Sequence, residues 1–141
     1  MSSFKMIDKI RQGHENREWG KQAEQIAAEY LIKEGYLIRE QNWRVGNTIE
    51  IDIIAEKEGT IAFVEVKARK GNVIAGEDAV DKAKCEKIVR GGDIYLRQQK
   101  FLYRYRLDVI VVDGSPENYQ IRHYPDAFLP PLNGTAKASR R

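Results

Sequence analysis

Residues 49–69 read IEIDIIAEKEGTIAFVEVKAR and contain the clearest strand pattern of the chain. Alternation with a period of two predicts that Ile49, Ile51 and Ile53 share one face of the first strand and that Asp52 lies on the other. The polar residues 57–60 (KEGT) have the length of a hairpin loop, and the apolar run after them predicts a returning strand. The sequence therefore predicts an antiparallel hairpin at the centre of the fold.

The register of this hairpin brings two acids together. If the loop comprises Lys57–Thr60, Glu56 pairs with Ile61 and, counting back, Asp52 lies opposite Glu65. A shift of one residue would break this arrangement. Like charges directly opposite each other destabilise a sheet, and they are tolerated best where a cation lies between them. Mg²⁺ prefers carboxylate and other oxygen ligands, so both acids are candidate metal ligands.

Two neighbours of Glu65 add to this candidate site. Lys67 projects from the same face as Glu65, where its ammonium can orient a water or stabilise charge on a phosphate. Val66 points into the core and can offer its backbone carbonyl as a further ligand. In the same register Glu50 lies opposite Lys67, and an ordinary cross-strand ion pair is the simpler interpretation of Glu50.

Two predicted helices supply further candidates. The first runs from Trp19 to a stop at Gly35 and carries Glu24 on a stripe bordering its apolar face, from which Glu24 can reach the sheet face of Asp52. The second covers about residues 79–98 and places Lys84 between apolar residues four positions away on either side.

Each of these residues also has a structural interpretation. Asp52 and Glu65 could be solvated acids on an open sheet face. Glu24 could be a helix-edge acid, and Lys84 could lay its stem on the core with its ammonium in water. The histidines do not stand in a zinc-ligand spacing, and Cys85 is most simply a packed thiol.

Composition limits the class of protein. The chain has 141 residues, 42% of them hydrophobic, and a formal net charge of +3. This charge permits contact with nucleic acid without requiring it. The single cysteine, Cys85, excludes an internal disulfide and a cysteine zinc cluster. No secretory signal or membrane-spanning stretch is evident, so a cytoplasmic location is expected.

One domain is expected over residues 17–128, with a flexible segment at 1–16 and a disordered basic tail at 129–141. Its elements follow the order helix, three strands, helix, two strands, which predicts an α/β fold with a mixed sheet flanked by helices. Gly91 and Gly92 fall inside the second helix and mark a weak point, a kink or a close packing contact.

Four stretches resemble a known family. They read GKQAEQIAAEYLIKEGYLIREQNWR, IEIDIIAEKEGTIAFVEVKAR, AVDKAKCEKI and YRLDVIVV. They resemble the YraN family of small bacterial proteins, which is similar to a branch of the PD-(D/E)XK nuclease superfamily close to archaeal Holliday-junction resolvases. The resemblance implies a restriction-endonuclease-like core with about five strands, Mg²⁺ or Mn²⁺ as cofactor, and DNA, branched DNA included, as partner. Resolvase-like relatives are commonly homodimers.

The resemblance also implies roles position by position. Asp52 takes the place of the metal-binding aspartate, and Glu65 and Lys67 take the places of the acid and lysine of the (D/E)XK motif. Glu24 matches a glutamate of the first helix that resolvase-like relatives use near the metal. Lys84 matches a family lysine on the second helix.

Other positions match less directly. Asn42 and Arg44 match the family's N-x-R, which either contacts phosphate or braces the strand. Asp108 matches the aspartate of its R-x-D-V strand, for which a structural role is expected. Ile49 departs from the family's pattern, which has glycine before the glutamate at position 50.

The resemblance thus implies an endonuclease that hydrolyses phosphodiester bonds with the help of a metal. In this hypothesis the catalytic residues are Glu24, Asp52, Glu65 and Lys67, and the metal ligands are Asp52, Glu65 and Glu24 together with the Val66 carbonyl. The basic residues near this site, Arg44, Arg69, Lys70 and Lys84, are the candidate nucleic-acid contacts. The alternative is a nuclease-fold module that binds DNA or a protein partner without cutting.

Overall fold

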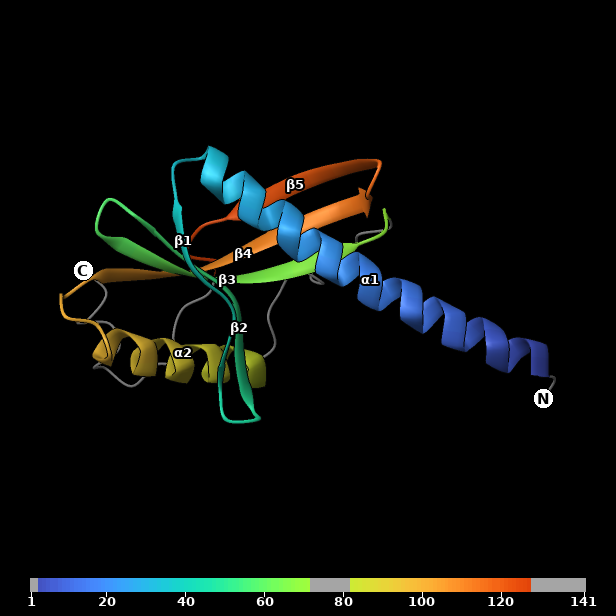
Figure 1. The fold of residues 1–141 in the computed structure, drawn as a ribbon, viewed down its shortest axis with the longest axis horizontal. Helices are drawn as coiled ribbons and strands as arrows, with labels where there is room; N and C mark the ends of the chain where they lie inside the picture. Colours follow the sequence, from blue (N-terminus) through green and yellow to red (C-terminus); the bar gives the residue numbers. More distant parts are fainter. Residues whose placement is uncertain (1–2, 72–81, 128–141) are drawn as a thin grey trace.

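The computed structural model describes residues 3–71 and 82–127 (Figure 1). Its elements in chain order are α1 (Ser3–Lys33), β1 (Leu37–Val45), β2 (Ile49–Lys57), β3 (Thr60–Arg69), α2 (Lys82–Arg97), β4 (Arg104–Ser115) and β5 (Asn118–Tyr124). The strands form one five-stranded sheet in the order β1-β2-β3-β4-β5, in which β3 and β4 are parallel and the other neighbours antiparallel. The predicted α/β fold with a mixed sheet is confirmed.

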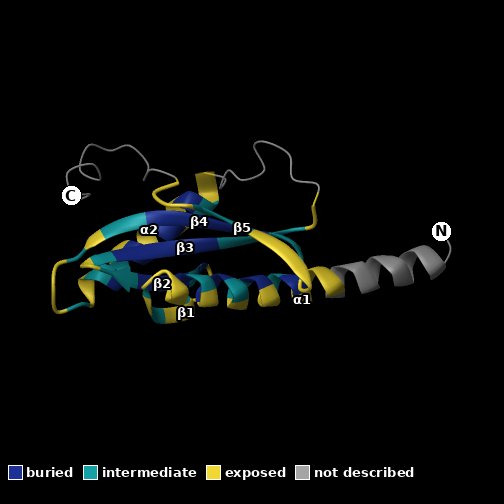
Figure 2. Cartoon of the chain, turned by 90° about the horizontal axis from the view of Figure 1, so that it is seen from above, coloured by how far each residue is buried: buried dark blue, intermediate teal, exposed yellow. Residues whose placement is uncertain are grey.

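The sheet lies between the two helices (Figure 2). On the α1 side, Leu31 and its neighbours pack against residues such as Ile53 and Val64. On the α2 side, Ile88 packs in a second core that includes Phe63. No helix among the described residues is long and apolar enough to cross a membrane.

The β2–β3 hairpin has the predicted register. Glu56 lies opposite Ile61, as expected. The loop is shorter than the four residues predicted, because the first and last residues of Lys57–Thr60 pair with each other. The two residues between them have φ angles of 51° and 81°, as a two-residue type I′ hairpin turn requires.

The helix α1 is longer than the sequence pattern predicts. It begins at Ser3 rather than Trp19, because the intervening residues are rich in good helix formers such as Lys, Arg, Gln and Glu and contain no proline. Gly35 ends it as predicted: it has a φ of 95°, and its N–H donates back to the carbonyl of Ile32 at 3.0 Å.

Parts of three predicted segments lie outside the described residues. These are the first residues of the predicted second helix (79–81), most of the loop before it, and the basic tail at 129–141. The described part of the second helix ends at Arg97, one residue before its predicted end.

The strand β2 departs from regular alternation at Asp52. Ile51 packs on the α2 side of the sheet, whereas Ile53 packs on the α1 side. The prediction that these two residues share a face is therefore wrong, because the pleat is broken between them. The neighbouring strand β1 is irregular at the same level, where Asn42 has a φ of 50°. Asp52 thus lies in an irregular segment between the two helical layers.

The two glycines of α2 make the close packing contact that was one of their three interpretations. A Cβ atom on Gly91 would lie 2.7 Å from Cγ2 of Ile49, and one on Gly92 would lie 3.0 Å from the ring of Phe63. The absence of side chains therefore lets α2 approach the sheet directly.

This packing predicts opposite effects for two helical glycines. We expect Gly91→Ala to lower the free energy of unfolding by about 1–3 kcal/mol, because the added methyl group has to displace Ile49, although helix propensity alone favours alanine by about 1 kcal/mol. Gly20→Ala in α1 is the matched control, since a Cβ there meets nothing within 4 Å. It should stabilise by up to about 1 kcal/mol. Urea unfolding measures both, and stabilisation by both changes would contradict the close contact.

Candidate functional site

Asp52 lies where β2 parts from β3. The paired register of the two strands ends at Ile53 and Val64. Beyond this point, Oδ2 of Asp52 accepts a hydrogen bond from the backbone N–H of Val66 at 2.9 Å. A side-chain oxygen therefore replaces a strand carbonyl as the acceptor, and the strands can diverge without leaving this N–H unpaired. We call the region of residues 50–52 and 65–67 the strand fork.

Glu65 is the second acid of the strand fork and is only 9% exposed. Its Oε2 lies 3.6 Å from the ammonium of Lys84, which reaches it from α2. Its Oε1 is buried and has no hydrogen-bond partner among the described residues. An unpaired buried carboxylate oxygen is costly, and an oxygen-binding cation would satisfy it.

Asp52 and Glu65 both have raised pKa values. Burial, and after it repulsion from Glu65, raises the pKa of Asp52 to about 8. Burial also raises the pKa of Glu65, although the ammonium groups of Lys84 and Lys67 oppose this effect. At neutral pH the pair therefore retains a proton. A cation that binds between the acids has to displace it.

Glu24 approaches the strand fork from the α1 side. The side-chain amide of Asn42 donates to Oε1 of Glu24 at 3.0 Å and to Oε2 of Glu50 at 3.1 Å. After burial and Glu65, the Glu24 carboxylate is a further group that raises the pKa of Asp52. The structure thus brings Glu24 into electrostatic contact with the fork, with Asn42 holding it.

Glu50 has a different partner from the one predicted. Its carboxylate pairs with Arg44 on β1 at 3.0 Å, so the predicted pair with Lys67 is wrong. The reason is the strand fork: pairing between β2 and β3 stops at Ile53, and Glu50 no longer faces β3. Lys67 has no ion pair within the described ranges, and its positive charge acts on Glu65.

The remaining predicted basic residues lie on different elements. Arg44 has a side chain that is 60% exposed. The carbonyl of Arg69 accepts a hydrogen bond from the indole N–H of Trp19 at 2.9 Å, which fastens the end of β3 to α1. Lys70 follows and is exposed. Lys84 differs from them, because its ammonium is directed toward the acids of the strand fork.

The donor set suits a hard divalent cation. Asp52 and Glu65 provide two carboxylates, one of them with an unpaired oxygen, and Mg²⁺ is commonly held by one or two carboxylates with waters and substrate phosphates. Val66 packs its side chain on the α1 core, as predicted, and carries the backbone carbonyl expected as a further donor. Within residues 3–71 and 82–127, no three Asp, Glu, His or Cys side chains form a closed metal-binding group. A cation here would therefore complete its shell with backbone, water or substrate oxygens.

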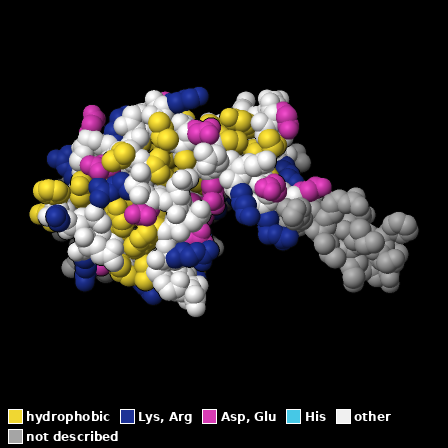
Figure 3. Space-filling view, viewed as in Figure 1, with side chains coloured by type: hydrophobic (Ala, Val, Ile, Leu, Met, Phe, Trp, Pro, Cys, Tyr) yellow, Lys and Arg dark blue, Asp and Glu magenta, His cyan; other side chains and the backbone are white. Residues whose placement is uncertain are grey.

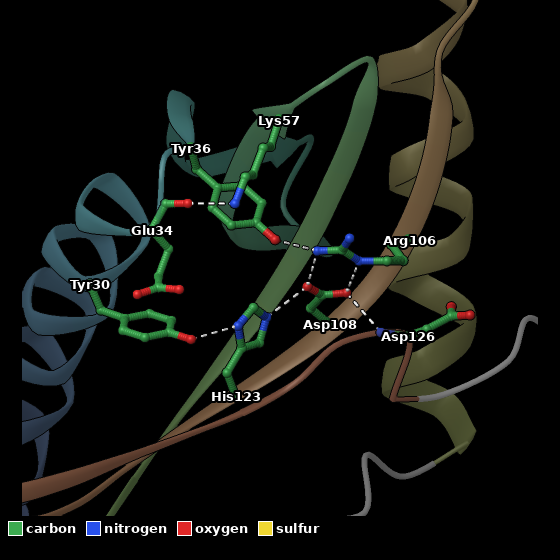
Figure 4. Close-up of polar contacts among 8 residues, drawn as sticks. All are labelled: Tyr30, Glu34, Tyr36, Lys57, Arg106, Asp108, His123 and Asp126. Atoms are coloured by element: carbon green, nitrogen blue, oxygen red, sulfur yellow. Dashed lines mark hydrogen bonds and ion pairs between the residues drawn. The ribbon is translucent and has the colours of Figure 1, made fainter.

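Asp108 of β4 belongs to a separate polar cluster (Figure 4). Its carboxylate accepts hydrogen bonds from Arg106 at 2.9 and 3.0 Å and from the backbone N–H of Asp126 at 2.9 Å, and it pairs with Nε2 of His123 at 2.8 Å. The other ring nitrogen of His123 hydrogen-bonds the Tyr30 hydroxyl at 3.0 Å. Although burial acts to raise it, these bonds hold the pKa of Asp108 below its usual value. The cluster fastens α1 and β5 to β4, which is the structural role expected for Asp108.

Sequence reasoning missed the strand fork and the bridging role of Asn42. One signal for the fork is present in the sequence: three apolar residues, 53–55, follow Asp52 without a break, which a strand alternating between a core face and a polar face would not show. The bridge made by Asn42 joins elements distant in sequence, and spacing within one element does not reveal it.

The fold and the strand fork define an α/β protein with one buried and one half-buried carboxylate, Glu65 and Asp52, flanked by lysines. The model of a family described as "Uncharacterised protein family UPF0102" matches residues 23–112, which include the whole strand fork. The chain is 43% identical over 119 residues to a UPF0102 protein of Bacteroides thetaiotaomicron, covering 84% of this chain and 98% of the relative. It is 40% identical to one of Phocaeicola vulgatus with the same coverage, and 36% identical to one of Clostridium tetani, covering 80% of this chain and 95% of the relative. The chain belongs to the UPF0102 family, which confirms the resemblance to the YraN family.

The raised pKa of Asp52 predicts that this residue makes the protein less stable as pH rises. The folded chain binds more protons than the unfolded chain between about pH 4 and about pH 8, so the free energy of unfolding falls over this range. Asp52→Asn keeps an acceptor for the Val66 N–H but cannot ionise. Without divalent ions it should exceed the native chain in stability at pH 8, by up to a few kcal/mol at about 1.4 kcal/mol per pKa unit, and the excess should vanish toward about pH 4.

Asp108→Asn is the matched control because its effect has the opposite sign. The pKa of Asp108 is lowered by its partners, so its contribution is present at neutral pH and is lost as the pH falls through the folded-state value. This variant should be less stable than the native chain at neutral pH, with a smaller deficit in acid. Chemical unfolding followed by circular dichroism across pH measures both variants. A pH dependence left unchanged by Asp52→Asn would contradict the buried acid pair.

Proposed function

We propose that this protein is a metal-dependent, endonuclease-like hydrolase that cleaves phosphodiester bonds in DNA, branched DNA included. The observation that carries the proposal is the acid pair of half-buried Asp52 and buried Glu65. One oxygen of Glu65 is unpaired, and the positive charges of Lys67 and Lys84 act on this acid. Acids kept together at such a cost in free energy favour a bound cation. The match of these positions to the (D/E)XK motif supports the same chemistry.

Each residue of the strand fork has a role in this chemistry. Asp52, Glu65 and the Val66 carbonyl would hold Mg²⁺, or Mn²⁺ in its place. A bound ion of this kind stabilises negative charge on a phosphate and lowers the pKa of a bound water. Lys67 positions the attacking water and stabilises the charge that develops on the phosphate. Glu24 borders the acids and orients the groups around them.

Basic residues around the strand fork would bind the flanking phosphates. Arg44, Arg69 and Lys70 are the candidates for these sequence-independent contacts. Lys84, whose ammonium lies 3.6 Å from Glu65, would be a further phosphate contact next to the acids. Figure 3 shows Lys and Arg interspersed with Asp and Glu on the face that carries α1. With a net charge of only +3, we expect few phosphate contacts and a correspondingly shallow dependence of affinity on salt.

A nuclease-fold module that binds DNA or a protein without cutting is the second candidate. The observation that favours it is the contact between Lys84 and Glu65, since this ammonium compensates the charge of one of the two acids. The two candidates differ in whether the strand fork supports turnover, and they share the same fold.

Metal binding is the first prediction of the proposed function. Calorimetry should show binding of Mg²⁺ or Mn²⁺ that strengthens as pH rises from about 6 to about 8, because the ion displaces the retained proton. A double variant, Asp52→Asn with Glu65→Gln, should bind at least about ten-fold more weakly. Asp113→Asn is the control, since this acid pairs with Arg122 away from the strand fork. A native chain that binds neither ion at either pH would leave the hydrolase without its mechanism.

The proposed function also predicts that Lys67 is needed for DNA cleavage but not for metal binding. Lys67→Met should retain metal binding but cut DNA about 100-fold more slowly or worse, because it removes the group that stabilises transition-state charge. Lys100→Met, an exposed lysine after α2, is the control and should cut like the native chain. The assay uses duplex, single-stranded, flap and four-way-junction DNA. If the native chain binds metal yet leaves all four uncut, the hydrolase proposal fails and the binding module is favoured.

A further inference from the structure

An apolar cleft lies between α2 and the sheet, on the opposite side of the sheet from α1. Its volume is about 740 Å³. Its lining includes four aromatic side chains, Phe63, Phe101, Tyr103 and Tyr105, and three leucines, Leu96, Leu102 and Leu107. Charged residues of α2, Arg90, Asp93 and Arg97, also border it. The strand fork contributes none of the residues that line the cleft.

The rim of this cleft exposes large apolar side chains to solvent. Phe101 is 71% exposed and Leu102 is fully exposed in the segment that joins α2 to β4. Single exposed apolar residues are ordinary, but neighbouring ones beside an aromatic cleft mark a surface that binds an apolar segment.

The described chain ends beside this cleft. The backbone N–H of Ala127 donates to the carbonyl of Leu107 at 2.8 Å, and Leu107 lines the cleft. The next five residues are Phe128–Leu132, with the sequence FLPPL. An entirely apolar segment therefore begins one residue after a backbone contact with the cleft lining.

We propose that Phe128–Leu132 binds in this cleft of its own chain. Two adjacent prolines favour the extended polyproline II conformation, so the segment loses little conformational freedom on binding. Aromatic-lined grooves are the surfaces that recognise such segments. At about 3.1 Å per residue, five residues extend about 15 Å from Ala127.

Phe128–Leu132 of a second copy could compete for the cleft. The chain's own segment is favoured because it is tethered next to the cleft. Because Ala127 is already fixed to Leu107, the segment is present at a high effective concentration, of the millimolar order for a short tether. This inference does not depend on the proposed hydrolase, since it uses no residue of the strand fork.

Disulfide trapping in the full chain tests the proposal. In a Cys85→Ala background, Leu102→Cys is combined with Leu129→Cys, and the control pair combines Ile32→Cys with Leu129→Cys. Ile32 is 57% exposed but lies on α1, across the sheet from the cleft. Under mild oxidation we expect the cleft pair to form an intramolecular disulfide at least about ten-fold faster than the control pair, as close attachment requires. Non-reducing electrophoresis and intact mass distinguish linked monomer from dimer.

Three outcomes would overturn the proposal. They are equal rates for both pairs, no cross-link in the cleft pair, and a cross-linked dimer, which would assign the cleft to the segment of a second copy. Hydrogen exchange supplies a second measurement in which Cys85 is unchanged. Leu129→Asp should raise amide exchange across residues 101–107 several-fold, whereas the control Thr135→Asp should leave it unchanged. Equal exchange in both variants would also overturn the proposal.

Discussion

The hydrogen bond from the backbone N–H of Val66 to the carboxylate of Asp52 is the interaction on which the site depends. Two strands can part only where the freed backbone groups find other acceptors, and this side chain provides one. The acceptor is an acid, so the bond that satisfies the Val66 N–H also places a half-buried carboxylate between the strands. Glu65 is buried beside it, and the lysines at 67 and 84 reduce part of the resulting repulsion. The strand fork thus satisfies the backbone where the strands part, but it does so by placing two acids that repel each other close together.

Two polar clamps outside the strand fork stabilise its surroundings. The guanidinium of Arg39 on β1 donates to the Tyr95 hydroxyl, the Glu56 carboxylate and the Gln99 amide oxygen at 2.6 to 2.7 Å, which fastens β1 and β2 to α2. The cluster around Asp108 fastens α1 and β5 to β4 (Figure 4). Every buried oxygen of Asp108 is paired, whereas one oxygen of Glu65 is not. This contrast separates an acid that maintains the fold from one that is available to a ligand.

Local periodicity predicts the parts of the structure that are locally determined. The hairpin register follows from the loop and the alternation, which is why Glu56 opposite Ile61 could be predicted. The same counting fails one residue beyond Ile53, because it assumes a regular pleat that the strand fork interrupts. Contacts such as that of Asn42 with Glu24 join elements whose relative position depends on the packing of the whole domain. No pattern within one element contains that information.

The chain has an acid at position 52, where an amide would also satisfy the backbone. An asparagine at position 52 would still accept the Val66 N–H through its side-chain oxygen, and it would add no buried charge. A glutamine at position 65 would remove the repulsion and much of the cost of burial. The backbone bond at position 52 therefore does not require a carboxylate, whereas Glu65 also contributes an ion pair with Lys84. Because the pair retains a proton at neutral pH, a ligand that uses this charge must be able to displace it, and a divalent cation is the simplest group that can do so. That condition links the strand divergence at Asp52, through the pKa shifts of the two acids, to the metal chemistry that we propose for the site.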